Sequence, residues 1–290
     1  PSTMITRKCA PALAVGCTVV IKPASQTPYS ALALGVLAKE AGFPDGVINI
    51  ITGSAAAIGK ELTENPIVKK ISFTGSTEVG KVLLQQSAST VKKVSMELGG
   101  HAPFVVFEDA NIDEAVTGAM LSKFRNSGQT CICANRIFVH EKVYDEFLDK
   151  FTQEVNKIKV GNGLEEGILS GPLIDQPSLM KVLDQVKDAV NQGAKVAVGG
   201  DIHPLGGNFF QPTVLSNVTT EAKITYEETF GPVAPLYKFR TDEEVIKLAN
   251  DTPYGLASYF YSRDIGRIWR VAEALEYGMV GVNTGLTTKA

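Results

Sequence analysis

Residues 17–25 read CTVVIKPAS, and this stretch decides how the first part of the chain folds. The β-branched run at 17–22 predicts a short buried strand. Thr27 and Pro28 then predict the start of a helix, with Thr27 as its N-cap, and Gly42 predicts its end. A strand that runs straight into a capped helix is typical of a parallel β/α unit.

The same alternation continues along the chain. Strands are predicted at 46–51 and 69–73, and helices at 54–65 and 75–87. Repeated strand–helix units predict a parallel, doubly wound sheet. Such sheets bind ligands at the carboxyl ends of their strands, which is where residues 22–25 and 75–80 lie.

The segment 75–80 reads GSTEVG at a predicted helix start. Its backbone amides and the helix dipole suit a phosphate group. The spacing is not G-x-G-x-x-G, however, and Gly-Ser-Thr is also an ordinary helix start. The pattern by itself therefore leaves a nucleotide contact and a plain helix start equally open.

A second α/β lobe begins near Gly100. Its predicted strands are at 102–107, 136–140, 195–198, 256–261 and 278–283, and its predicted helices are at 113–123, 143–160, 178–193, 241–249 and 265–275. The extended segment 209–215 contains Pro212, which predicts an edge or irregular strand. A further strand at 92–96 closes the first lobe, so we expect two domains, 1–98 and 99–290.

Two polar segments of these lobes carry reactive side chains. Residues 124–133 read FRNSGQTCIC, and a cysteine in such a loop can act as a nucleophile in its thiolate form. A single cysteine is more often a small buried apolar residue, so Cys131 needs partners elsewhere in the chain. Glu97, before Gly99-Gly100, can serve as a positioned acid or base, or can be an exposed loop carboxylate.

Composition excludes several classes of protein. The chain has 290 residues, a net charge of -3 and no basic run, so we expect no nucleic-acid partner. Its apolar runs are too short to span a membrane. Four cysteines and three scattered histidines predict neither a disulfide framework nor a metal site. We expect a cytoplasmic protein, or a mitochondrial-matrix protein if a transit peptide precedes Pro1.

Three motifs in register give the chain a resemblance. MELGG at 96–100, FRNSGQTC at 124–131 and EETFGP at 227–232 resemble the aldehyde dehydrogenase superfamily in order and spacing. The resemblance implies that Cys131 is the nucleophile and Glu97 the base that activates water. It also implies a set of NAD(P)-binding residues: Lys22, Pro23, Ala24, Ser25, Gly75, Ser76, Leu98, Glu228 and Phe230.

More narrowly, the segments 4–8, 122–126, 130–135 and 208–213 resemble succinate-semialdehyde dehydrogenases. That resemblance implies that Arg7 and Arg125 hold the distal carboxylate of the substrate, which suits the bidentate geometry of arginine. Glutarate semialdehyde, one methylene longer, is the alternative substrate, and a non-catalytic fragment is the alternative class of protein. Cys133 is either a redox partner of Cys131 or a passive small residue.

Ser25 bears on the choice of cofactor. Many relatives that prefer NAD carry Glu here, whereas Ser25 leaves room for a 2′-phosphate and Lys22 adds a positive charge. We therefore expect NADP, with NAD as the alternative. The resemblance also implies a homo-oligomer. The family's Asn before Pro1 and its C-terminal segment lie outside residues 1–290, so we expect these residues alone to be inactive or poorly folded.

Overall fold

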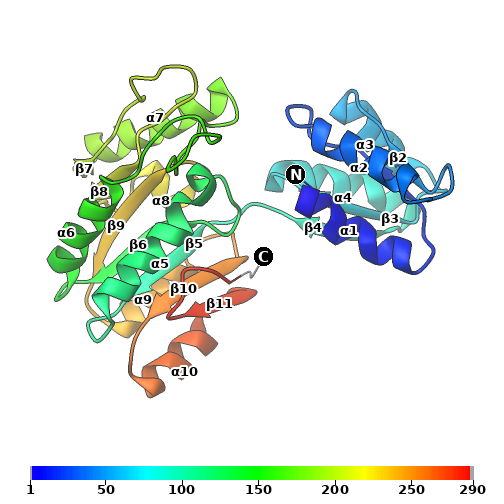
Figure 1. The fold of residues 1–290 in the computed structure, drawn as a ribbon. Coiled ribbons are helices and arrows are strands. Elements are labelled where there is room, and N and C mark those ends of the chain that lie inside the picture. The colour runs from blue at the N-terminus through cyan, green and yellow to red at the C-terminus, as the bar shows by residue number, and fades with distance from the viewer. Residues whose placement is uncertain (1, 288–290) are drawn as a thin grey trace. The chain divides into compact units, whose positions relative to one another are not determined.

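The computed structural model describes residues 2–287, and Figure 1 shows the chain. It divides into two compact units, with the boundary between Leu98 and Gly99. We call residues up to Leu98 unit 1 and residues from Gly99 onward unit 2, and we describe each by itself.

Unit 1 alternates helices and strands as predicted. In chain order its elements are α1 (Ser2–Ala14), β1 (Val19–Ile21), α2 (Tyr29–Glu40), β2 (Ile48–Ile50), α3 (Ala55–Glu64), β3 (Lys70–Thr74), α4 (Thr77–Ser87), the 3₁₀ turn η1 (Ala88–Thr90) and β4 (Lys93–Glu97). The first helix, α1, was not predicted, because Pro11 inside it is a helix-breaking signal. The expected Thr27 cap is wrong, because Pro28 precedes α2 without a side-chain cap.

The strands of unit 1 are parallel but pair in two separate sheets. β1 pairs with β2, and β3 pairs with β4. Alternation of strands and helices predicts the direction of the strands, while the choice of neighbour depends on packing between distant segments. The segments 22–25 and 75–80 follow β1 and β3 directly, so both lie at the carboxyl ends of parallel strands, as predicted.

Unit 2 is built on one larger sheet. Its elements are β5 (Ala102–Val106), α5 (Ile112–Phe124), η2 (Arg125–Gly128), β6 (Ala134–His140), α6 (Tyr144–Val155), α7 (Gln176–Asn191), β7 (Lys195–Val198), β8 (Thr213–Ser216), α8 (Lys223–Tyr226), β9 (Val233–Phe239), α9 (Asp242–Asn250), β10 (Ala257–Tyr261), α10 (Ile265–Ala274) and β11 (Met279–Val282). The strand order is β11-β10-β5-β6-β9-β8-β7, with only the β7–β8 pair antiparallel.

The sheet of unit 2 is covered on both faces (Figure 1). Strand β5 shows this, because Phe104 packs in one apolar cluster with residues of α5 and α6, and Val105 packs in another with residues of α7, α9 and α10. Strands buried on both faces read as continuous apolar runs, which is why β5 and β6 were recognisable in the sequence.

Two expectations for unit 2 are corrected by the structure. Helix α6 ends at Val155 and not near Val160. Pro212 does not mark an edge strand, because β8 begins one residue later at Thr213 and lies between β7 and β9. Pro212 is thereby outside the ladder that its missing N–H would disturb. Among residues 2–287, no helix is long and apolar enough to cross a membrane.

Candidate functional site

The loop that carries Cys131 begins with a sharp reversal after α5. Asn126, Ser127 and Gly128 follow one another with φ of 53°, 55° and 74°. Non-glycine residues rarely adopt this left-handed conformation, and it persists only where the surroundings enforce it. The Cys131 side chain beyond the reversal is half-buried. Strained backbone next to a partly accessible cysteine is consistent with a functional loop.

Hydrogen bonds hold the start of this loop against the segment before α7. The Ser127 hydroxyl donates to the carbonyl of Gly171 at 3.0 Å. The Gln129 side chain donates to the carbonyl of Pro172 at 3.3 Å and accepts from the amide of Ile174 at 2.9 Å. The loop is therefore fixed by long-range contacts that no local pattern encodes.

The motifs that carried the resemblance meet within unit 2. A Cβ on Gly100 would collide with the carbonyl oxygen of Cys131, so the Gly-Gly pair allows the nucleophile loop to approach closely. The amide of Gly100 also donates to Glu228 Oε1 at 3.1 Å. A Cβ on Gly128 would likewise collide with the carbonyl of Gly231. Gly100, the Cys131 loop and the segment 228–231 thus form one contiguous site within unit 2.

Phe230 sits in this site with unusual backbone. Its φ is 52°, so Phe230, two residues after Glu228, has a left-handed backbone. The side chains of Glu228 and Phe230 are both partly exposed. Both predicted cofactor contacts of unit 2 therefore lie beside the nucleophile loop and remain reachable by a ligand.

Glu97, the predicted base, is the last residue of β4 in unit 1. It pairs in register with Thr74, its side chain is exposed, and its carbonyl accepts from the amide of Gly75 at 3.1 Å. Lys8 of α1 reaches the same strand ends and donates to Ser72 and Phe73. Burial lowers the pKa of Lys8, and the Glu97 carboxylate opposes that shift. Sequence reasoning missed Lys8 because it predicted no helix there.

The two predicted cofactor segments of unit 1 offer groups that suit a dinucleotide. Lys22 Nζ lies 3.5 Å from the Ser25 hydroxyl, while Pro23 is buried and Ala24 is exposed. No residue of 22–25 is a carboxylate, so this segment suits a phosphate.

At the end of β3, the Ser76 side chain caps α4, so the helix N-terminus follows Gly75 directly. A Cβ on Gly75 would collide with the ring of Phe73, and one on Gly80 with the side chain of Leu98. Both glycines therefore leave space for a neighbouring side chain in this turn. With Lys22 and Ser25, the residues present fit a nicotinamide dinucleotide.

The predicted substrate arginines lie on different units. Arg7 is on α1 of unit 1 and Arg125 begins η2 of unit 2, and both side chains are exposed. Cys131, Arg125, Glu228 and Phe230 thus belong to unit 2. The remaining predicted residues, Glu97, Leu98, Arg7 and the cofactor segments, belong to unit 1.

Cys133 points away from solvent. It is 1% exposed, its thiol donates to the carbonyl of Lys123 at 3.4 Å, and burial raises its pKa. Both Cys131 and Cys133 are free thiols. The proposed disulfide between them would require Cys133 to leave this interior position, and it stays a prediction.

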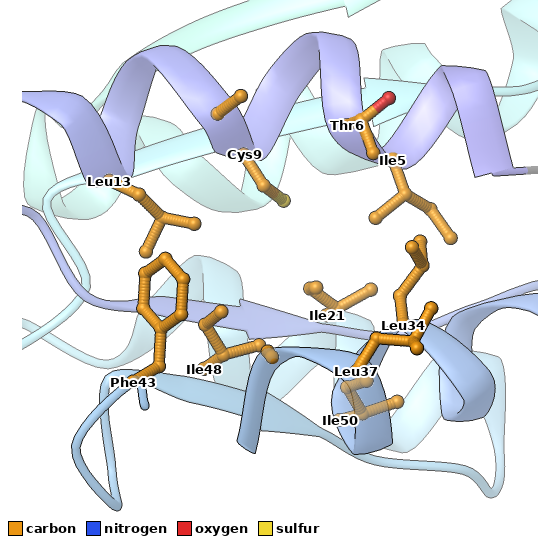
Figure 2. A pocket seen from close by; sticks show the side chains of 12 residues that line it. Ile5, Thr6, Cys9, Leu13, Ile21, Leu34, Leu37, Phe43, Ile48 and Ile50 are labelled. Atoms are coloured by element: carbon orange, nitrogen blue, oxygen red, sulfur yellow. The ribbon is translucent and has the colours of Figure 1, made fainter. Parts of the chain in front are cut away.

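Unit 1 also contains an apolar pocket of about 270 Å³, shown in Figure 2. Ile5, Cys9 and Leu13 of α1 face Ile48 and Phe43 across it. Burial raises the pKa of the Cys9 thiol. Binding sites need a few polar groups to orient a ligand, and this lining has almost none, so the pocket is not the candidate site. No cluster of three or more metal-ligating side chains occurs in residues 2–287.

Comparison with known proteins identifies the family of the chain. Residues 1–290 match the aldehyde dehydrogenase family. The chain is 59% identical over 286 residues to the succinate-semialdehyde dehydrogenase [NADP(+)] GabD of Escherichia coli K12, covering 99% of this chain and 59% of that protein. It is also 59% identical over 286 residues to a glutarate-semialdehyde dehydrogenase of Pseudomonas aeruginosa PAO1, covering 99% of this chain and 59% of that protein.

A solved structure gives the same result. The crystal structure of succinate-semialdehyde dehydrogenase from Burkholderia pseudomallei superposes with a TM-score of 0.99 at 58% identity, covering 100% of this chain and 60% of that one. The predicted α/β fold is thereby confirmed. The chain spans about three fifths of the length of the relatives it matches. The chain belongs to the aldehyde dehydrogenase family.

Proposed function

We propose that this chain carries the nucleophile, the base and the cofactor-binding segments of an NAD(P)-dependent enzyme that oxidises succinate semialdehyde to succinate. The observation that carries the proposal is the contiguous site of unit 2, where the Cys131 loop packs against Gly100 and the Glu228 segment. A half-buried cysteine fixed between these two motifs has the setting of a nucleophile and not that of a core residue.

In the proposed mechanism the Cys131 thiolate attacks the aldehyde carbon and forms a thiohemiacetal. The backbone N–H of Cys131 stabilises the resulting oxyanion. The nicotinamide ring, when bound, supplies the acceptor for the hydride, and a thioester on Cys131 is left. Glu97 then takes a proton from water, the hydroxide attacks the thioester carbonyl, and the carboxylate product leaves as the Cys131 thiolate is restored.

The proposed cofactor is NADP, with NAD as the alternative. Lys22 and Ser25 lie side by side at the end of β1, so a 2′-phosphate there would meet a cation and a hydroxyl. The name of the Escherichia coli relative supports the same choice. The matched measurement is kcat/KM with each cofactor at saturating aldehyde, and a higher value with NAD would contradict the preference.

The proposed substrate carries a carboxylate tail, because Arg7 and Arg125 are exposed guanidinium groups, and Arg125 lies six residues before Cys131. Glutarate semialdehyde is the second candidate, favoured by the Pseudomonas aeruginosa relative. One extra methylene changes binding by only about 1–3 kcal/mol, so both aldehydes need to be assayed side by side.

A protection experiment tests the nucleophile and the carboxylate requirement together. Iodoacetamide alkylates the chain with or without aldehyde, and mass spectrometry reads each cysteine. We expect succinate semialdehyde to protect Cys131 more than butanal, which has the same length without the carboxylate. Arg125→Gln should remove this difference, and exposed Cys17 serves as the internal control. Equal protection by both aldehydes in the unsubstituted chain would contradict the proposed substrate class.

Turnover supplies the second test, made on a protein in which residues 1–290 are joined to the remaining segments of a relative, because these residues alone are expected to be inactive or poorly folded. Reduction of NADP in the presence of succinate semialdehyde is followed by absorbance, with Cys131→Ser as the inactive variant and Cys17→Ser as its control. Reduction that persists in Cys131→Ser would remove the proposed nucleophile. Self-association of the protein remains a prediction, which sedimentation of the purified protein can measure.

A further inference from the structure

Lys123 is a fully buried cation in the last turn of α5. Its Nζ donates to Asn135 Oδ1 at 2.8 Å, and the thiol of Cys133 lies beside it. Burying an ammonium group is costly unless hydrogen bonds and nearby charges compensate. The proposed mechanism assigns no role to Lys123, so it does not explain this buried charge.

Its position relative to the nucleophile loop suggests the reason. The loop 125–133 leaves α5 after Phe124 and enters β6 at Ala134. Three hydrogen bonds join the two ends of this loop, residues 122–123 and 133–135, which we call its neck. They run from Lys123 Nζ to Asn135 Oδ1, from the amide of Ala134 to Ser122 Oγ at 3.2 Å, and from the Cys133 thiol to the Lys123 carbonyl at 3.4 Å. Lys123 contributes the only charged side chain among these three bonds.

The chain links this cation to Cys131 through Cys133. Cys133 is in contact with Lys123 and is two residues from Cys131, so the two cysteine Cα atoms are at most about 7 Å apart. A charge inside the protein is screened much less by salt than a charge in solvent. A cation within about 4–6 Å of a thiol favours its ionised form.

Burial and the neighbouring titratable groups act on the pKa of Lys123 in opposite directions. Burial lowers the pKa of Lys123, and Cys133 and the carboxylate of Glu228 oppose that shift. Burial raises the pKa of Cys133 and lowers that of His101, the latter to about 3, so both are neutral near pH 7. Glu228 is therefore the anion that faces the Lys123 ammonium.

We propose that Lys123 is a positioning residue for the nucleophile: held by Asn135, its ammonium closes the neck of loop 125–133 and supplies the positive charge that favours the Cys131 thiolate. The inference rests on the proposed function only in taking Cys131 as the nucleophile. Cys133 is the buried neighbour of this cation, and its redox role stays a separate prediction.

The test measures the alkylation rate of Cys131 by iodoacetamide across a range of pH. Cleavage by trypsin after Arg125 and Arg136 yields the peptide 126–136, which separates Cys131 and Cys133 from the other two cysteines. Lys123→Met keeps the length of the side chain without its charge. We expect the midpoint of the Cys131 profile to rise by about one pH unit, which lowers the rate at neutral pH by about tenfold.

Companion variants separate charge from stability. Asn135→Leu leaves the buried cation without its acceptor, so we expect a lower melting temperature and a rise of the alkylation midpoint that is smaller than in Lys123→Met. The double variant Lys123→Met/Asn135→Leu forms an apolar pair and should regain melting temperature while keeping the raised midpoint. Lys92→Met is the control, because the Lys92 ammonium is also held by hydrogen bonds, in its case to three backbone carbonyls, but belongs to unit 1. It should leave the midpoint unchanged.

The outcomes are distinct. A folded Lys123→Met variant whose midpoint equals that of the unsubstituted chain overturns the proposal, as does a change confined to melting temperature. If Lys123→Met does not fold, the alkylation midpoint of Cys131 is measured in Lys123→Met/Asn135→Leu, and a midpoint equal to that of the unsubstituted chain again overturns the proposal. Alkylation needs neither substrate nor cofactor, so a failure of the proposed function shows separately as loss of the protection of Cys131 by succinate semialdehyde.

Discussion

Gly128 is the point where the nucleophile loop touches the segment after Phe230, and an alanine there should disturb both. Its φ is 74°, and a Cβ would lie 2.6 Å from the carbonyl carbon of Gly231 and closer still to its oxygen. Real Cβ atoms stay at least 3.0 Å from such atoms, so clearing the carbonyl carbon takes a shift of 0.4 Å (3.0 − 2.6), and clearing the closer oxygen takes a larger one.

Two effects lower the free energy of unfolding in Gly128→Ala. The left-handed backbone costs an alanine roughly 1–2 kcal/mol, and overpacking costs about 1–3 kcal/mol. We therefore expect the free energy of unfolding to fall by about 2–5 kcal/mol. A misplacement approaching 1 Å can also cost about 10²-fold in rate, so kcat should fall by about ten- to a hundredfold while KM for the aldehyde changes less.

Chemical denaturation gives the stability term, and the alkylation rate of Cys131 reports the loop geometry without turnover. Gly206→Ala is the matched control, because Gly206 has a φ of 71° with no atom near the added Cβ. It should lose only the backbone term and keep the Cys131 reactivity. If Gly128→Ala loses no more stability than Gly206→Ala and alkylates at the original rate, the close approach of the two loops does not position Cys131.

Three other predictions follow from the site and its surroundings. Glu97→Gln should slow hydrolysis of the thioester by about 10²–10⁴-fold and leave alkylation of Cys131 intact. The thioester should then accumulate, which mass spectrometry can measure. An amount of thioester equal to that of the unsubstituted chain would count against Glu97 as the base. Ser25→Glu should raise KM for NADP more than KM for NAD, because a carboxylate repels the 2′-phosphate beside Lys22; equal changes in the two KM values would contradict this. Burial raises the pKa of Asp109, but hydrogen bonds from Arg263, Ser262 and Asp264 outweigh burial, so the net pKa is lowered. The ionised Asp109 therefore stabilises the fold fully above its unfolded pKa of about 3.9, and this stabilisation is lost as the pH falls through the lower folded pKa. Asp109→Asn should therefore be less stable at neutral pH and show a shallower loss of stability in acid, which denaturation at a series of pH values can check.

Local patterns were sufficient for most elements of the fold. Strands such as β5 and β6 are buried on both faces and read as apolar runs, and the caps Ser54 and Thr241 mark helix starts that the structure confirms. These signals are local because each depends on residues within a few positions of one another. The motif residues Glu97 and Cys131 were likewise recognisable by type and spacing, although their roles stay predictions.

Only the tertiary structure decided which segments meet. The strand order of unit 2 brings Gly100, Cys131 and Glu228 together, and no local pattern specifies that order. Lys8 and Lys123 were missed for the same reason, since the surroundings of a lysine depend on contacts with residues far along the chain. The sequence by itself thus determined which side chains are available for chemistry, and long-range packing decided which of them are held beside the nucleophile.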